Sequence, residues 1–162
     1  YAALRSTGTK RFAGEAAGSR KAYAFSFSEG KSTTVHVFES AIDLLSYATL
    51  QKMRGADWKA EHYVSLGGCC FSVEEGLPPS LTHMLHEKQN IQVIKLHLDN
   101  DNAGRSITQA ISKLFQNDYQ VINAPPPCGK DVNDYLMMKL KQMEERSQNG
   151  AGKNFIHEPQ RA

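Results

Sequence analysis

Runs of apolar residues alternate along the chain with segments that have helical periodicity. Short apolar or alternating runs predict strands at 21–27, 33–39, 61–68, 91–99 and 119–125. Apolar positions that recur every three or four residues predict helices at 40–53, 78–89, 102–116 and 132–146. From residue 33 onward the predicted order is strand and helix in regular alternation.

This alternation predicts the fold class. Strands joined through helices form right-handed crossovers, so we expect an α/β domain with a mainly parallel sheet of about four strands, flanked by helices. In such sheets ligands bind outside the carboxyl ends of the strands. Functional residues are therefore expected just after the strands.

The helix that follows Ser40 illustrates the pattern. Ser40 is a suitable N-cap, and Ile42, Leu45, Thr49 and Met53 fall on one helical stripe. This spacing predicts an amphipathic helix.

The 162 residues suit one domain, and the net charge is +2. The charge is uneven: residues 1–31 carry six Lys and Arg against two Glu, residues 139–162 carry five against three, and residues 32–138 carry eight against twelve acids. A solvated surface would explain this. The alternative is nucleic-acid contact by the basic flanks around an acidic centre that requires a cation.

Composition also bears on location. No stretch approaches the roughly 20 apolar residues of a membrane span, and the start lacks a signal-peptide pattern. Three cysteines are an odd number and fit neither a disulfide framework nor a metal pair, which favours a reducing cytoplasm. The chain begins at Tyr1, so we treat it as a fragment of something longer.

Three acidic motifs follow predicted strands. They are FESAID, with Glu39 and Asp43; LDNDNAG, with Asp99 and Asp101; and GKDVND, with Asp131, Asn133 and Asp134. Each alone could be a helix cap or a surface group. Together at one sheet edge they are oxygen ligands of the kind that Mg²⁺ takes, and metal-assisted phosphoryl transfer is the chemistry this suits. His36 and His97, in neighbouring strands, are interpreted as core residues.

The order VHVFESAIDLLSY, LHLDNDNAGR, GKDVNDYL, from about residue 34 to 140, resembles the toprim domain of topoisomerases and bacterial primases. The match is best with the primase-like branch and implies the toprim, Rossmann-like fold. The stretch YAALRSTGTKRFAGEAAGSRKAYAFSF, residues 1–27, resembles a segment that joins toprim to an upstream domain of unknown function in proteins of conjugative plasmids and transposons. The resemblance implies a linker and strand at 1–31, joining to an upstream domain, and a catalytic-type domain at 32–146. The low-complexity composition of residues 147–162 predicts a disordered tail.

The resemblance also implies roles for the site residues. Asp99 and Asp101 would bind Mg²⁺ or Mn²⁺, with Asp131 helping, and Glu39 would act as general acid or base or as a further ligand. The remaining expected groups are the second-rank ligands Asp43 and Asn133, the phosphate-binding Arg105 and Lys130, and the glycines at or near the site, Gly67, Gly68 and Gly104. The sequence departs from the pattern at Ser40, where the family has Gly, and at Asn133, where primases often have a second Asp. The loss of that charge makes one metal a safer expectation than two.

Two function classes remain open. The first is a Mg²⁺-dependent enzyme domain acting on DNA, expected to be single-stranded, and on nucleotides, by primase-like nucleotidyl transfer or phosphodiester cleavage. The second is a non-catalytic DNA-binding accessory module of a mobilisation protein. The full acidic set favours the first.

Overall fold

The structure is a computed structural model, and it describes residues 1–10, 12–68 and 76–151. The elements of the main domain are β4 (Thr34–Phe38), α1 (Ala41–Met53), β5 (His62–Ser65), α2 (Pro79–Glu87), β6 (Val93–His97), α3 (Asn102–Phe115), β7 (Gln120–Asn123) and α4 (Val132–Ala151). They are preceded by β1 (Ala3–Arg5), β2 (Ala13–Glu15), a 3₁₀ turn η1 (Lys21–Tyr23) and β3 (Ser26–Phe27). The predicted alternation of strands and helices is confirmed, with strands shorter than the apolar runs.

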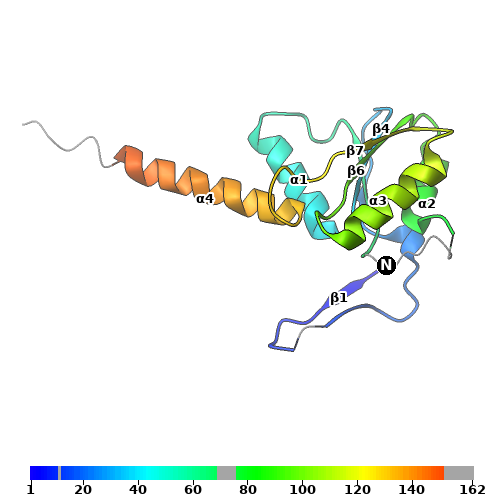
Figure 1. The fold of residues 1–162 in the computed structure, drawn as a ribbon, viewed down its shortest axis with the longest axis horizontal. Coiled ribbons are helices and arrows are strands. Elements are labelled where there is room, and N and C mark those ends of the chain that lie inside the picture. The colour runs from blue at the N-terminus through cyan, green and yellow to red at the C-terminus, as the bar shows by residue number, and fades with distance from the viewer. Residues whose placement is uncertain (11, 69–75, 152–162) are drawn as a thin grey trace, which may run out of the picture.

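The sheet has five strands in the order β3-β5-β4-β6-β7. β5, β4, β6 and β7 pair in parallel, and β3 adds one antiparallel edge strand. The predicted α/β class with a mainly parallel sheet is therefore confirmed. Because β4 and β6 are neighbours, the segments that follow their carboxyl ends lie side by side (Figure 1).

Each face of the sheet has its own hydrophobic core. Side chains alternate across a strand, so Val35 and Val37 point to one face and Phe38 to the other. The first face packs against α2 and α3, through residues such as Leu81 and Ile111. The second face, with Phe38, Tyr63 and two buried histidines, packs against α1 and α4. The two layers of helices leave the carboxyl edge of the sheet as the place where loops from both faces meet.

The apolar stripe predicted on α1 faces away from the core. Ile42 and Leu45 are 56% and 52% exposed, and Met53 is 39% exposed. The side of α1 that is buried carries Asp43, Leu44, Ser46, Ala48 and Leu50. The amphipathic interpretation of the stripe was wrong, because α1 turns a partly polar side towards α4 and the sheet edge, where polar partners are available.

The N-terminal region differs from the single strand predicted at 21–27. Residues 21–23 form a 3₁₀ turn, closed by the Tyr23 N–H donating to the Arg20 carbonyl, and the strand is limited to Ser26 and Phe27. Tyr23 is 53% exposed, so the alternation of aromatic residues did not mark a buried face. Before this turn, β1 and β2 pair as an antiparallel hairpin that stands away from the sheet (Figure 1).

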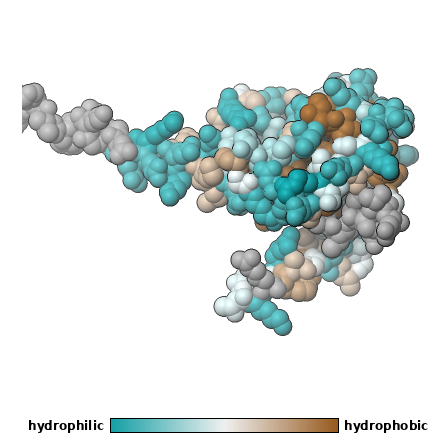
Figure 2. Space-filling view, in the orientation of Figure 1, coloured by the Kyte–Doolittle hydropathy of each residue, from teal (hydrophilic) through white to brown (hydrophobic). Residues whose placement is uncertain are grey.

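Helix α4 extends beyond the body of the molecule (Figure 1) and continues to Ala151, through residues predicted as tail. The rest of that segment, 152–162, lies outside the described residues, as do Cys69 and Cys70. The outer turns of α4 are largely hydrophilic (Figure 2), and residues 141–148 are exposed. Among the described residues, the helices are too short or too polar to span a membrane.

Candidate metal and phosphate site

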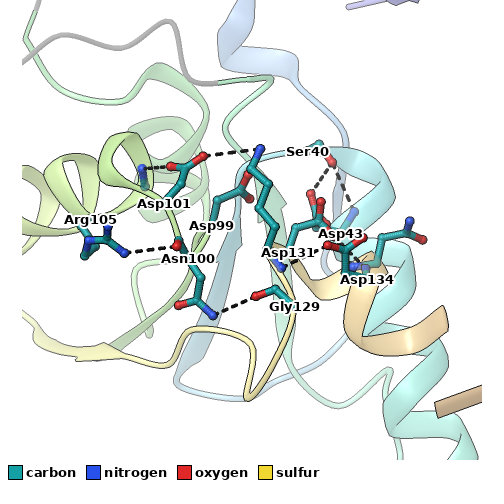
Figure 3. Close-up of polar contacts among 12 residues, drawn as sticks. Ser40, Asp43, Asp99, Asn100, Asp101, Arg105, Gly129, Asp131 and Asp134 are labelled. Carbon is teal, nitrogen blue, oxygen red and sulfur yellow. Dashed lines mark hydrogen bonds and ion pairs between the residues drawn. The ribbon is translucent and has the colours of Figure 1, made fainter. Parts of the chain in front are cut away.

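The three acidic motifs meet at the carboxyl edge of the sheet, as predicted. Glu39 follows β4, Asp99 follows β6, and Asp131 directly precedes α4. Burial is the main reason that the pKa of Asp99 and that of Asp43 are raised, and the nearby charge of Asp131 adds to both shifts. Figure 3 shows Asp99, Asp101, Asp131 and Asp43 arranged along this edge.

Asp99 and Asp101 differ in environment. The Asp99 side chain is 7% exposed, and burial raises its pKa. Asp101 is the N-cap of α3, where its Oδ1 accepts a hydrogen bond of 2.9 Å from the Gly104 N–H, which lowers its pKa. Asp99 is therefore largely shielded from solvent, whereas the start of α3 stabilises the charged form of Asp101.

Lys130 lies between these two acids. Its Nζ is 3.1 Å from Oδ2 of Asp99 and 3.4 Å from Oδ2 of Asp101. The two carboxylates raise the pKa of the lysine. The sequence predicted that Lys130 binds phosphate, whereas the structure pairs its ammonium with both members of the D-x-D motif.

Asn100, between the two aspartates, ties two loops together. Its Nδ2 donates to the carbonyls of Pro126, at 2.9 Å, and Gly129, at 3.2 Å, and its backbone N–H donates to the Lys130 carbonyl at 2.7 Å. The β6–α3 loop and the β7–α4 loop are thereby fixed to one another. Sequence reasoning missed this role, for which the only signal was an amide residue between two strand-end acids.

Ser40, Asp43 and Asn133 join the starts of α1 and α4. The Ser40 hydroxyl accepts from the Asp43 N–H at 3.3 Å, which confirms the predicted N-cap, and donates to Asp43 Oδ2 at 2.5 Å. The Asn133 N–H donates to Asp43 Oδ1 at 3.3 Å, and Ser46 donates to Asn133 Oδ1 at 3.2 Å. Burial raises the pKa of Asp43. These contacts give Asp43 and Asn133 a structural role, and their role as second-rank ligands stays a prediction.

Glu39 lies beside the glycine turn that follows β5. Its carbonyl accepts from the Gly68 N–H at 2.9 Å, and Gly67 and Gly68 both have positive φ, 73° and 103°, which favours glycine. The predicted turn near the site is therefore present. Glu39 lines a cavity of about 620 Å³, together with residues that include Arg5, Tyr23 and Phe25.

Gly104 and Arg105 open helix α3. A Cβ atom at Gly104 would lie 2.1 Å from the Asp99 carbonyl oxygen, so this position requires glycine. The Arg105 guanidinium donates to the Asn100 carbonyl at 3.1 Å (Figure 3). It also donates to Asn102 Oδ1 at 2.6 Å. Arg105 is exposed. Its predicted contact with phosphate stays a prediction.

His36 and His97 form a buried chain beneath α1, in agreement with their interpretation as core residues. His36 Nδ1 lies 2.8 Å from His97 Nε2, and His36 Nε2 lies 2.6 Å from Glu61 Oε2. Burial lowers the pKa of both imidazoles. Each histidine finds its partner within the core rather than at the acidic edge.

The geometry of Asp99 and Asp101 fits a divalent cation. Both carboxylates already reach one cationic centre, the Lys130 ammonium, which acts as a stand-in for an ion. Within the described residues, no three His, Cys, Asp or Glu side chains are arranged to hold one metal together. Mg²⁺ is commonly bound through one or two carboxylates, with water and substrate phosphate completing its shell. Asp99 and Asp101 match that pattern, and neither Asp131 nor Glu39 joins them around the same centre.

Comparisons with known proteins identify the family. The chain is 28% identical over 142 residues to the uncharacterized protein pXO2-78 of Bacillus anthracis, an alignment that covers 78% of this chain and 38% of the relative. The chain thus spans well under half the length of that relative. A solved structure, the primase fragment of the bacteriophage T7 primase-helicase protein, matches 70% of this chain and 43% of its own, with 19% identity and a TM-score of 0.43. The family model described as Toprim-like matches residues 36–136, which include all three acidic motifs. The chain therefore belongs to the Toprim-like family.

Proposed function

We propose that this domain performs Mg²⁺-dependent phosphoryl transfer on DNA, by primase-like nucleotidyl transfer or phosphodiester cleavage, in the replication or transfer of a mobile element. The observation that carries the proposal is the pair of carboxylates, Asp99 and Asp101, whose oxygens lie within 3.1 and 3.4 Å of one cationic centre at the carboxyl edge of the sheet. Membership of the Toprim-like family supports it.

In this proposal the residues at the carboxyl edge of the sheet have different chemical roles. Asp99 and Asp101 hold the cation, which when bound supplies charge neutralisation for phosphate oxygens. Glu39, directly after the neighbouring strand β4, accepts or donates the proton at the reacting oxygen. Arg105 keeps guanidinium N–H groups beyond its two hydrogen bonds, and these suit a phosphate.

The cavity beside Glu39 supports single-stranded DNA as the substrate. Its wall includes the rings of Tyr23 and Phe25, which are 53% and 43% exposed, and the cation of Arg5. Exposed aromatic rings with nearby cations bind unpaired strands, because bases stack on the rings and the cations follow the phosphates. An unpaired strand in this cavity would run past Glu39.

The metal is tested first. Mn²⁺ or Mg²⁺ at a hundredfold excess over its Kd should raise the melting temperature by about 5 to 10 °C, since selective binding to the folded state stabilises it by about 2.7 kcal/mol. The double variant Asp99→Asn with Asp101→Asn should lose this rise. The matched control, Asp57→Asn with Asp118→Asn, removes two exposed charges elsewhere and should keep it. A melting temperature that ignores millimolar metal would refute the metal site.

The chemistry is tested through Glu39. In metal-dependent nucleotide addition on single-stranded DNA, or cleavage of supercoiled DNA, Glu39→Gln should lower the rate by about 10² or more, the usual scale for a lost acid-base group. DNA binding and the metal-induced stabilisation should remain, because Glu39 stands apart from the D-x-D pair. Glu87→Gln, an exposed acid on α2, is the control. If the chain shows no turnover while it binds DNA, the accessory-module function replaces the enzymatic one.

A further inference from the structure

We propose that Lys130 is a built-in competitor for the divalent cation, and that its ammonium leaves Asp99 and Asp101 when the cation binds. The inference rests on the metal site of the proposed function and adds a role for this chain's own lysine. In the structure the ammonium takes the position that two carboxylate oxygens define, at 3.1 and 3.4 Å. A divalent cation on the same two oxygens would stand almost in contact with that ammonium, and like charges at such a distance repel strongly.

The exchange needs only a side-chain movement. The Lys130 backbone is fixed on both sides: its N–H donates to Asp134 Oδ2 at 3.0 Å, and its carbonyl accepts from the Asn100 N–H at 2.7 Å. The side chain itself is 57% exposed, and the rotamer change of an exposed lysine is fast. The loop can therefore keep its shape while the ammonium swings away from the acids.

In the absence of a metal ion, the Lys130 ammonium stabilises the acidic edge. Asp99 is buried and lies beside Asp101 and Asp131, so without a cation the three carboxylates destabilise one another. Lys130 offsets that repulsion in the folded chain. Once released, the ammonium stays tethered at the rim of the site, within the length of one side chain, where it can meet the phosphate that accompanies the cation.

Titration of Mn²⁺ into the full chain by calorimetry tests the exchange. Lys130→Met keeps the length of the stem and removes the charge, so Mn²⁺ should bind about tenfold more tightly, equivalent to about 1.4 kcal/mol. A factor of this size, rather than a larger one, is expected because water screens the exposed ammonium. Without metal the same variant should melt below the wild type, and saturating Mn²⁺ should close the gap. Lys113→Met, an exposed lysine on α3, should change none of these values.

A second measurement separates exchange from simple repulsion at a distance. Amine-reactive labelling of the wild-type chain, followed by peptide mass spectrometry, should show faster modification of Lys130 when Mn²⁺ is added, with Lys113 unchanged. Unchanged labelling of Lys130, or equal or weaker Mn²⁺ binding by Lys130→Met, would overturn the exchange while leaving the proposed reaction intact. Exchange without turnover on any DNA substrate would uphold the inference and refute the reaction. A wild-type chain that binds no Mn²⁺ would overturn both.

Discussion

Gly104 gives the sharpest test of how the acidic edge is built. It lies in the first turn of α3 with helical backbone, so helix propensity alone predicts that Gly104→Ala stabilises the protein by about 1 kcal/mol. The new Cβ, however, would lie 2.1 Å from the Asp99 carbonyl oxygen and 2.9 Å from the Asp99 backbone nitrogen and carbonyl carbon. The two effects have opposite signs, and their sizes decide the outcome.

The steric clash with Asp99 is expected to outweigh the gain in helix propensity. Overpacking a core site costs about 1 to 3 kcal/mol. The upper end applies here because the new Cβ is fixed to the backbone of α3 and meets backbone atoms of Asp99, so neither partner can rotate away. After the gain in propensity, the net destabilisation is about 2 kcal/mol, or about 4 to 8 °C in melting temperature for a chain of this size. Relief of the clash also moves the start of α3 away from Asp99, so Mn²⁺ binding should weaken as well.

The assay is urea and thermal unfolding with and without Mn²⁺. Ala103→Gly, at the exposed neighbouring position, is the matched control: it should cost about 1 kcal/mol through propensity and leave the metal affinity unchanged. If Gly104→Ala equals or exceeds the wild type in stability, helix propensity has decided the outcome, and the close approach of α3 to Asp99 is refuted.

Two further predictions concern the starts of the helices and the core. Ser40→Ala removes the cap of α1 and the hydrogen bond to Asp43, and should cost about 1 kcal/mol in thermal unfolding, whereas Ser40→Gly should cost only a few tenths; equal stability of the Ala variant and the wild type would show that the cap contributes nothing. Acidification from pH 7.5 to 5 should destabilise the protein, because burial holds the pKa of His36 and His97 below the 6.5 of the unfolded chain, so the unfolded state takes up more protons as the pH falls below that value. The loss approaches about 1.4 kcal/mol per pH unit for each histidine, and a flat profile in urea unfolding between these pH values would contradict the neutral buried pair.

Sequence patterns located the elements that depend on local signals. The strand β6, which precedes Asp99, lies in a segment rich in branched apolar residues, and the capped helix after Ser40 begins where its cap predicts. Strand ends on a parallel sheet share an edge, so the meeting of the three acidic motifs also followed from their positions. These features need no knowledge of tertiary contacts.

Features that depend on tertiary partners were not predictable in this way. The exposed stripe of α1 looks like a core face until α4 is known to pack on the polar side that holds Ser46. The hairpin β1–β2 is too short to show alternation, at three residues a strand. The charge partner of Lys130 could be assigned only from the three-dimensional structure. In sequence Lys130 is near Asp131 and Asp134, whereas in space it pairs with Asp99, which is far away in the chain.

The contacts that close the acidic edge join residues that are far apart in the chain. Asn133 meets Asp43 across 90 positions and Ser46 across 87, and Lys130 reaches back to the turn after β6. A chain that emerges from the ribosome with all five strands of its sheet but without the β7–α4 loop and α4 lacks these contacts. The pairing of Lys130 with the D-x-D motif therefore forms after the five strands, and the edge becomes charge-balanced only once the β7–α4 loop is in place. Until then a divalent cation would meet Asp99 and Asp101 without competition from the lysine.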